Sequence, residues 1–152
     1  MKVGVTATRW GVDERRLDTF KYIIEKLGIT HFDFGMCVGG DTQAYKIVRS
    51  LDKTVWVKGH PPIEQGQFFS NVDCDDIAKP KDYLSRDRDI VDESEVMIAM
   101  PKENTEKRRS GTWYTVRYAK KVIKSDKGSC KKLYIILPNG KVEFFDFKKL
   151  TK

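Results

Sequence analysis

The stretch VMIAMPKENTEKRRSGTWYTVRYAKKVIK, residues 96–124, is the part of the sequence that decides the fold. Its first five residues form an apolar run, which is typical of a strand buried inside a parallel sheet. A charged loop and a small-residue turn at 110–112 follow, and apolar residues then recur at helical spacing through 112–124. A buried strand followed by an amphipathic helix predicts one repeating unit of a parallel α/β sheet.

The same alternation runs through the rest of the chain. Short apolar runs predict strands at residues 2–6, 31–37, 54–58, 96–100 and 133–137, with a last strand at 142–147. Helical spacing predicts one helix that ends at Gly28, a second that Asp41 caps, and two more at 83–93 and 112–124. The pattern predicts an α/β fold, a three-layer sandwich with a mostly parallel sheet of about five strands plus a short edge strand. At 152 residues we expect a single domain, residues 1–152.

Composition excludes several classes of protein. Hydrophobic residues make up 39% of the chain and charged residues 34%, which is typical of a globular protein rather than a disordered one. No apolar run approaches the ~20 residues of a membrane span, so we expect no membrane partner. The first ten residues, MKVGVTATRW, lack the apolar core of a signal peptide, and we therefore expect a cytoplasmic protein.

The cysteines predict neither a disulfide framework nor a metal site. Cys37, Cys74 and Cys130 are odd in number and none is close to another in the sequence, which fits reduced thiols. The acidic residues around Cys74 indicate a solvated turn, because no histidine or second cysteine lies nearby. We expect no metal and no cofactor.

The net charge of +7 indicates an anionic partner. The excess is local, because residues 102–132 hold 11 Lys and Arg against 3 Asp and Glu. Such a segment suits a small phosphate ligand or a nucleic acid. For the lysines after Arg117, a merely solvated helix face remains an equal alternative.

In a parallel sheet the loops after the strands gather at one edge, where ligands bind. The loop after the first strand offers Thr6, Thr8 and Arg9, whose backbone amides and guanidinium suit a phosphate, although an ordinary strand exit explains them equally well. Pro101 ends the fourth strand and begins the charged loop to the next helix, and we expect it among the ligand-binding residues.

The loops after the second and third strands leave alternatives open. Gly39 and Gly40 permit a close approach of backbone to ligand at a helix start. Asp41 either caps that helix or accepts a hydrogen bond from a ribose hydroxyl. His60 is either a hydrogen-bond donor or general acid at the ligand, or a polar plug at a proline turn.

The turn at Ser110, Gly111 and Thr112 is the strongest single candidate, because it joins a strand to a helix N-terminus and so predicts an anion site. Trp113 either stacks on a base or shields the site, and Arg117 lies about one turn further on. The alternative is a capped helix with its aromatics in the core. Arg86 and Arg88 point about 200° apart on a helix, so only one of them can serve the site. We expect Arg86 or Arg117 to add charge to the phosphate pocket.

The ordered motifs resemble a known superfamily. VTATR, CVGGD and HPP follow the first three strands, and RDRDIVDESEVMIAMP and SGTWYTVRYAK come after them. Together these motifs resemble the SLOG superfamily of Rossmann-like domains, which includes LOG phosphoribohydrolases and the DprA core. The small stand-alone DprA-like proteins of bacteria and phages are the most similar, over residues 1–140.

The resemblance implies a Rossmann-like fold that binds a nucleotide or a nucleotide-derived ligand at the carboxyl ends of the strands. LOG enzymes hydrolyse the N-glycosidic bond of nucleoside monophosphates with a glutamate that here falls on Thr115. Phosphate binding therefore transfers by resemblance, and hydrolysis does not, unless Asp41 or Glu93 replaces the glutamate. The open functions are a nucleotide sensor or sequestering protein, an N-glycosidase or deoxyribosyltransferase-like enzyme, and a single-stranded DNA-binding module. By resemblance alone, a homodimer or higher homo-oligomer is expected.

Overall fold

The structure is a computed structural model and describes residues 1–63 and 73–151. The strands are β1 (Lys2–Ala7), β2 (His31–Phe34), β3 (Trp56–Gly59), β4 (Asp76–Ile77), β5 (Val96–Met100), β6 (Lys132–Ile136) and β7 (Val142–Asp146). The helices are α1 (Glu14–Leu27), α2 (Gly40–Leu51), α3 (Tyr83–Glu93), α4 (Gly111–Ser125) and α5 (Phe147–Thr151). Within these residues, no helix has the length and apolar character that a bilayer crossing requires.

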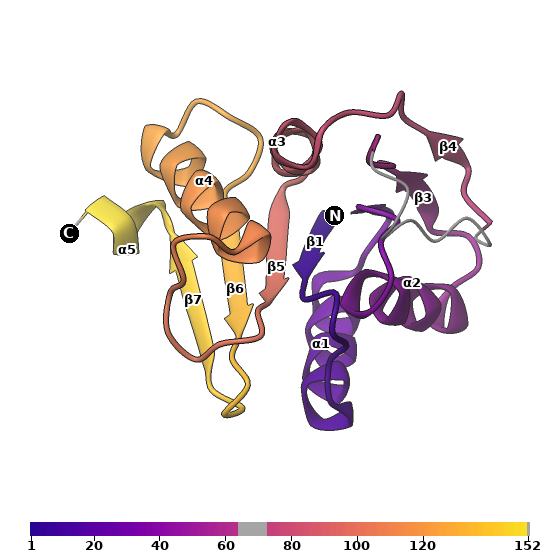
Figure 1. The fold of residues 1–152 in the computed structure, drawn as a ribbon, viewed down its shortest axis with the longest axis horizontal. Helices are drawn as coiled ribbons and strands as arrows, with labels where there is room; N and C mark the ends of the chain where they lie inside the picture. The colour runs from indigo at the N-terminus through magenta and orange to yellow at the C-terminus, as the bar shows by residue number, and fades with distance from the viewer. Residues whose placement is uncertain (64–72, 152) are drawn as a thin grey trace.

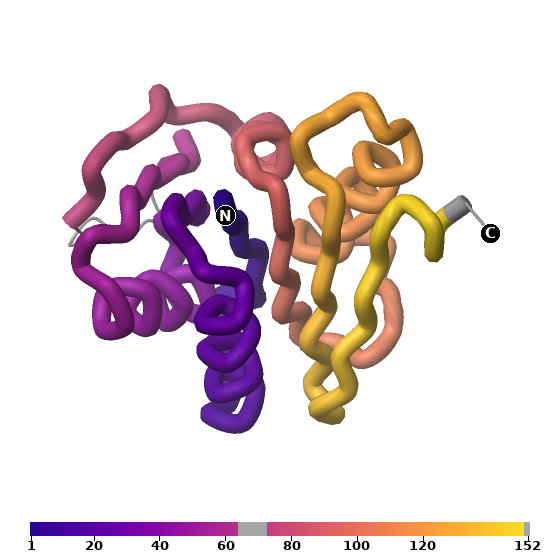
Figure 2. Tube along the Cα trace, turned by 180° about the vertical axis from the view of Figure 1, so that it is seen from behind, coloured from indigo at the N-terminus to yellow at the C-terminus, as the bar shows by residue number. Residues whose placement is uncertain are grey.

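The sheet has the strand order β4-β3-β2-β1-β5-β6-β7. Neighbouring strands are parallel, except that β7 runs antiparallel to β6. Helices α1 and α2 contact each other, as do α3 and α4. Figures 1 and 2, which view the molecule from opposite sides, show α4 on one side of the sheet and α1 on the other. This is a Rossmann-like three-layer α/β sandwich, as the sequence predicts.

Two apolar layers hold the sandwich together, one on each face of the sheet. Phe20 of α1 packs with Phe32 and Phe34 of β2 in the first layer. Met97 of β5 and Leu133 of β6 pack beneath α3 and α4 in the second. Alternate residues of a strand point to opposite faces, so the central strand β5, which serves both layers, is buried along its whole length.

The sheet is wider than predicted, and one helix was not predicted. Strand β4 escapes the sequence pattern because it has only two residues, both exposed, within a segment without periodicity. Helix α5 is likewise short, with five residues. The long loop predicted after His60 falls partly on residues 64–72, which lie outside the described residues.

The second helix begins earlier than its predicted cap. Its N-cap is Gly39, and Asp41 belongs to the first turn with its side chain buried. Burial directs that carboxyl group inward, away from the helix amides that a capping side chain would accept from.

The direction in which successive strands are added to the sheet reverses between β1 and β5, although these two strands are parallel. From β1 the connections proceed through α1 toward β2, whereas from β5 they proceed through α4 toward β6. The loops that leave these two adjacent strands therefore diverge and open a crevice at the carboxyl edge. Any ligand site of this fold is expected there.

Candidate ligand-binding site

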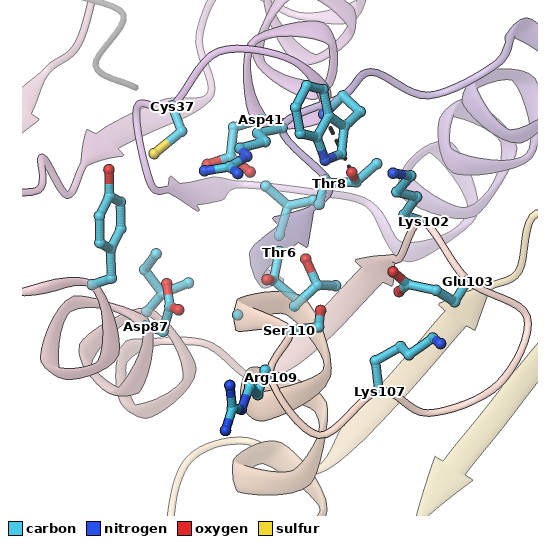
Figure 3. Close-up of a pocket in the computed structure, with 18 of the residues that line it drawn as sticks. Thr6, Thr8, Cys37, Asp41, Asp87, Lys102, Glu103, Lys107, Arg109 and Ser110 are labelled. Carbon is cyan, nitrogen blue, oxygen red and sulfur yellow. Dashed lines mark hydrogen bonds between the residues drawn. The ribbon is translucent and has the colours of Figure 1, made fainter. Parts of the chain in front are cut away.

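A cavity of about 890 Å³ opens at this crevice, a size typical of small-molecule sites. It is lined by β1 and the loop after it, the first turn of α2, α3, and the segment from Lys102 to Thr112. Figure 3 shows Thr6 and Thr8 between Asp41 and Asp87 on one side and Lys102 and Glu103 on the other. Charged groups of both signs therefore line the cavity on both sides of the two threonines.

The loop after β1 forms the centre of the lining, as the sequence predicts. Thr6, Thr8 and Arg9 all line the cavity, and both threonines are largely buried. The amide of Thr8 donates to Met100 O at 3.0 Å, and the Thr8 hydroxyl accepts from the amide of Trp10 at 3.2 Å. These bonds fix the loop at the end of the two central strands.

Gly39 and Gly40 do not line the cavity, and the structure gives them a packing role instead. A Cβ on Gly39 would collide with the backbone of Arg9, and one on Gly40 with the side chain of Ala7. The amide of Gly40 donates to Thr8 O at 2.9 Å and is therefore not available to a ligand. The glycines let α2 approach the loop after β1.

The N-terminus of α4 reaches the cavity through Ser110, Gly111 and Thr112. The Ser110 hydroxyl accepts from the amide of Trp113 at 3.2 Å, and the Ser110 carbonyl accepts from Tyr114 at 2.8 Å. The first amides of a helix have no partner within it. Among the described residues, the N–H groups of Gly111 and Thr112 therefore remain available to donate to a ligand. Nothing lies within 4 Å of a Cβ built on Gly111, so the space above this turn is open.

Positive charge surrounds this helix end. Besides Arg86 of α3, the cations that line the cavity are Arg9, Lys102, Lys107, Arg108 and Arg109. Arg117 does not line it. Its guanidinium bonds Glu106 at 3.0 Å and the carbonyls of Lys107 and Arg108, so it holds the cationic loop in place.

The opposite side of the cavity is a buried cluster of ionisable groups. Arg86 contributes from α3, donating to Gly35 O and to Cys37 Sγ and pairing with Asp87 at 3.1 Å. Asp41 lies close by, since a Cβ on Gly35 would be 2.6 Å from Arg86 Nη1 and 2.8 Å from Asp41 Oδ2. Of the two arginines that the sequence offered, Arg86 therefore faces the cavity.

Burial controls protonation in this cluster. It raises the pKa of Asp41 to about 7, against the opposing pull of the Arg86 guanidinium. It also raises the pKa of Asp87, again against Arg86, and raises the pKa of the Cys37 thiol to about 11. Burial alone would lower the pKa of Arg86, but Asp87, Cys37 and Asp41 together raise it, so the guanidinium stays charged. Cys37 is therefore an unreactive thiol.

Three further predicted residues lie outside the cavity lining. Trp113 is buried, and its indole N–H donates to Glu103 at 3.1 Å, so it braces the loop. Pro101 contributes its carbonyl to the buried Arg16. His60 is buried against Asp33 at 2.7 Å in a separate polar cluster.

Several lining residues are not among the site residues predicted from the sequence, and Trp10 and Asp87 are two of them. Trp10 is 67% exposed, and both Arg9 and Lys102 place a cationic group about 5 Å from its ring, at 5.0 and 5.1 Å. Asp87 follows Arg86 on α3 and lies close to Thr115, whose hydroxyl donates its proton to Gly111 O at 2.9 Å. The position of Trp10 directly after Arg9 is the one signal that marks it in the sequence.

Comparisons with known proteins identify the fold and nothing finer. No family model matches the chain, and no curated protein matches it. The X-ray structure of TM1055, a structural-genomics target, is similar with a TM-score of 0.57 and 16% sequence identity, covering 80% of this chain and 70% of that one. Likeness at this identity establishes the α/β architecture alone.

Proposed function

We propose that this protein binds a nucleotide or a nucleotide-derived phosphate ligand at the carboxyl ends of β1 and β5, as a sensor or sequestering protein. The observation that carries the proposal is the N-terminus of α4, where Gly111 and Thr112 line a cavity ringed by cations. Helix amides together with the helix dipole favour a bound phosphate group. The SLOG-like motifs support the same function, since the SGT turn is the one that their resemblance assigns to phosphate.

The base has a candidate partner in Trp10. This indole is exposed at the cavity lining, whereas Trp113 is buried and bonded to Glu103. A flat aromatic surface that is free to meet solvent suits stacking on a nucleobase, and Arg9 and Lys102 beside it suit an anionic ligand. The phosphate would then lie at α4 and the base toward the loop after β1.

An N-glycosidase or deoxyribosyltransferase-like enzyme on nucleoside monophosphates is the second candidate, and one observation favours it. The cavity has carboxyl groups even though Thr115 replaces the expected glutamate, because Asp41 and Asp87 line it beside Arg86. A carboxylate can stabilise the oxocarbenium-like charge of glycosidic cleavage. Asp87 lies next to Thr115 itself, while Glu93 is paired with Lys58 outside the cavity.

A ligand screen tests the proposal. Thermal shifts would be measured with nucleoside mono-, di- and triphosphates, ADP-ribose, cyclic nucleotides and a short single-stranded DNA, with products checked by chromatography. A ligand that binds only the folded state raises the melting temperature by mass action. We expect a saturable shift with at least one nucleotide that is recovered intact. Recovery of free base would instead favour the enzyme, and its loss in Asp87→Asn would assign the carboxyl group.

Two substitutions at one position separate charge from size. Gly111→Ala adds a methyl group in open space and should keep nucleotide affinity. Gly111→Asp places a negative charge at the same point and should weaken binding by at least about 10-fold, while an acidic residue in the first turn favours the helix itself. Equal nucleotide affinity in the two variants would contradict the site.

A further inference from the structure

A second polar site lies away from the nucleotide cavity, on the face of β2 and β3. Alternate residues of these strands point to opposite sides, so Phe32, Phe34 and Val57 enter one apolar layer while Asp33 and Lys58 point the other way. On that side the described residues form a groove of about 580 Å³. It is lined in part by Asp33, Lys58, Asp76 and Glu93.

Three side chains converge beneath this groove. His60 Nε2 is 2.7 Å from Asp33 Oδ2 and 4.0 Å from Glu93 Oε2. The three donor atoms all lie within 4.8 Å of one another. His60 and Asp33 are deeply buried, with side-chain exposures of 1% and 8%, whereas Glu93 is 39% exposed at the end of α3. Two buried donors and one exposed donor therefore face a common point.

The local charge is unbalanced. Lys58 Nζ pairs with Glu93 Oε1 at 2.5 Å and with Asp76 Oδ2 at 4.0 Å, which leaves Glu93 Oε2 directed toward the imidazole. With the imidazole counted as neutral, the groove has five carboxylates against three ammonium groups, an excess of two negative charges; these groups are Asp33, Asp76, Asp92, Glu93 and Glu95 against Lys2, Lys58 and Lys131. One divalent cation would neutralise this excess.

We propose that Asp33, His60 and Glu93 bind a first-row divalent transition metal, with Zn²⁺ preferred. One imidazole nitrogen and two carboxylate oxygens form a donor set that suits Zn²⁺, Mn²⁺ or Fe²⁺ better than Mg²⁺ or Ca²⁺, which prefer oxygen alone. Ligand bonds of about 2.0–2.2 Å require His60 Nε2 and Asp33 Oδ2, which are 2.7 Å apart, to separate slightly, and require Glu93 to move closer to His60, as its exposure permits. The proton that His60 Nε2 and Asp33 share would leave this position, to the other ring nitrogen or to solvent, when the metal binds. The remaining coordination position faces the groove, and Lys58 keeps its bond to the second oxygen of Glu93.

The sequence did not indicate this site, because its donors come from β2, the end of β3, and α3. It is separate from the nucleotide cavity, and it does not depend on the proposed function. A metal with three protein ligands and one open position can hold a water or a substrate oxygen. Such a site would add a second binding function to the same sheet.

Calorimetry with the full, untagged chain tests the metal site, since a polyhistidine tag would bind the same ions. The metal-stripped protein would be titrated with Zn²⁺, Mn²⁺ and Mg²⁺. We expect one equivalent of Zn²⁺ to bind, with affinity in the order Zn²⁺ > Mn²⁺ > Mg²⁺. Saturable Mg²⁺ binding as tight as that of Zn²⁺, or no Zn²⁺ binding, would overturn the proposal.

Two variants locate the ion. Glu93→Gln removes one metal ligand at an exposed position and should weaken Zn²⁺ binding by more than about 10-fold. Loss of a residue that only supports a metal ligand already costs at least that much. Asp76 also pairs with Lys58, but its carboxylate does not face the imidazole. Asp76→Asn should therefore keep the affinity for Zn²⁺. Equal losses in the two variants would show diffuse attraction by the groove and overturn the site.

Imidazole NMR of the wild type gives a check that does not depend on any variant folding. The chain has 2 histidines, and the second, His31, lines the same groove two residues before Asp33, with its Nδ1 2.9 Å from the Thr30 hydroxyl. Zn²⁺ at one equivalent should shift the ring nitrogens of His60 more than those of His31. Unchanged His60 resonances under saturating Zn²⁺ would contradict the ligand assignment.

Discussion

Asp41 places a carboxyl group in the interior beside Asp87 and a single guanidinium, that of Arg86. Burial raises the pKa of Asp41 from 3.8 to about 7, so the folded chain keeps a proton that the unfolded chain releases. The stabilising effect of that proton is complete below about pH 3.8 and is lost as the pH rises toward about 7. The free energy of unfolding should therefore fall across this window, by at most about 1.4 kcal/mol per pH unit from this group.

Asp41→Asn should make the stability less dependent on pH. It carries no titrating proton, so its free energy of unfolding relative to wild type should rise from about pH 4.5 to about pH 7.5, measured by urea denaturation. Asp52→Asn is the control. The pKa of Asp52 is lowered by its bonds from Thr54, so this group is ionised across the whole window and its substitution should cost the same at both pH values. A parallel pH dependence of wild type and Asp41→Asn would contradict the buried carboxyl.

Trp10→Ala tests whether the exposed indole stacks on a base. Removing one base–aromatic stack typically costs about 1–3 kcal/mol, so nucleotide affinity should fall by roughly 5- to 150-fold. Ribose 5-phosphate, which has no base, should bind wild type and Trp10→Ala equally well by calorimetry. Equal losses for both ligands would mean that Trp10 supports the loop and not the base.

The sequence could predict that a residue lines the cavity only where that residue directly follows a strand. Thr6, Thr8 and Arg9 line the cavity because they follow β1 directly, and the turn at Gly111 because it follows β5. Asp87 was missed, because its place beside Thr115 depends on how α3 packs against α4. No spacing within one helix contains that information.

Helix α2 depends on a glycine that α4 does not need. A Cβ on Gly40 would meet Ala7 Cβ and lie 3.0 Å from Thr8 O, whereas a Cβ on Gly111 would meet nothing. Gly40→Ala should therefore lower the free energy of unfolding by about 1–3 kcal/mol through overpacking, and Gly111→Ala should leave it nearly unchanged. Chemical denaturation of the two variants checks this. Similar free energies of unfolding in the two variants would mean that the loop after β1 moves to accommodate the added methyl group without destabilising the fold.

The elements themselves were largely predictable, and their exceptions have physical reasons. Helical spacing and an apolar run place α3 and β5 at the bounds that the structure has. Strand β4 has two exposed residues, too few to show a period, and it forms because β3 offers a parallel edge. The prediction that Asp41 caps α2 was wrong, because Gly39 is the N-cap and the Asp41 side chain is buried in the first turn.

Positive charge lies both at the cavity and far from it, and the two groups of lysines should affect nucleotide binding differently. Lys107 lines the cavity, whereas Lys121 and Lys124 are exposed on the last turns of α4, about 15–20 Å along the helix from its N-terminus. Lys107→Glu should weaken nucleotide binding by about 10-fold. Lys121→Glu with Lys124→Glu should leave nucleotide binding unchanged, because exposed charges more than about 8 Å apart are largely screened at physiological salt. Calorimetry checks both.

The DNA-binding alternative makes the opposite prediction for these lysines. Binding through the far end of α4 should fail in the double variant and should weaken steeply with salt. Loss of single-stranded DNA binding there, with no nucleotide bound by the wild type, would transfer the function from the cavity to the helix face.

The overall architecture followed from the alternation of strands and helices, but the sites that combine distant elements did not. The cluster of Asp33, His60 and Glu93 exists only once β2, β3 and α3 are assembled. The proposed phosphate site, in contrast, belongs to one strand–helix unit, β5 and α4, so the sequence alone can suggest it.

Backbone NMR of the ¹⁵N-labelled chain tests the phosphate site most directly. The protein would be titrated in turn with AMP, GMP, CMP, dTMP and ADP-ribose, with the amide resonances assigned. We expect the ligand that binds to shift the amides of Gly111 and Thr112 first and most, with a smaller response in the loop after β1. A bound nucleotide that leaves these two amides unchanged and shifts another surface would contradict an anion site at the N-terminus of α4.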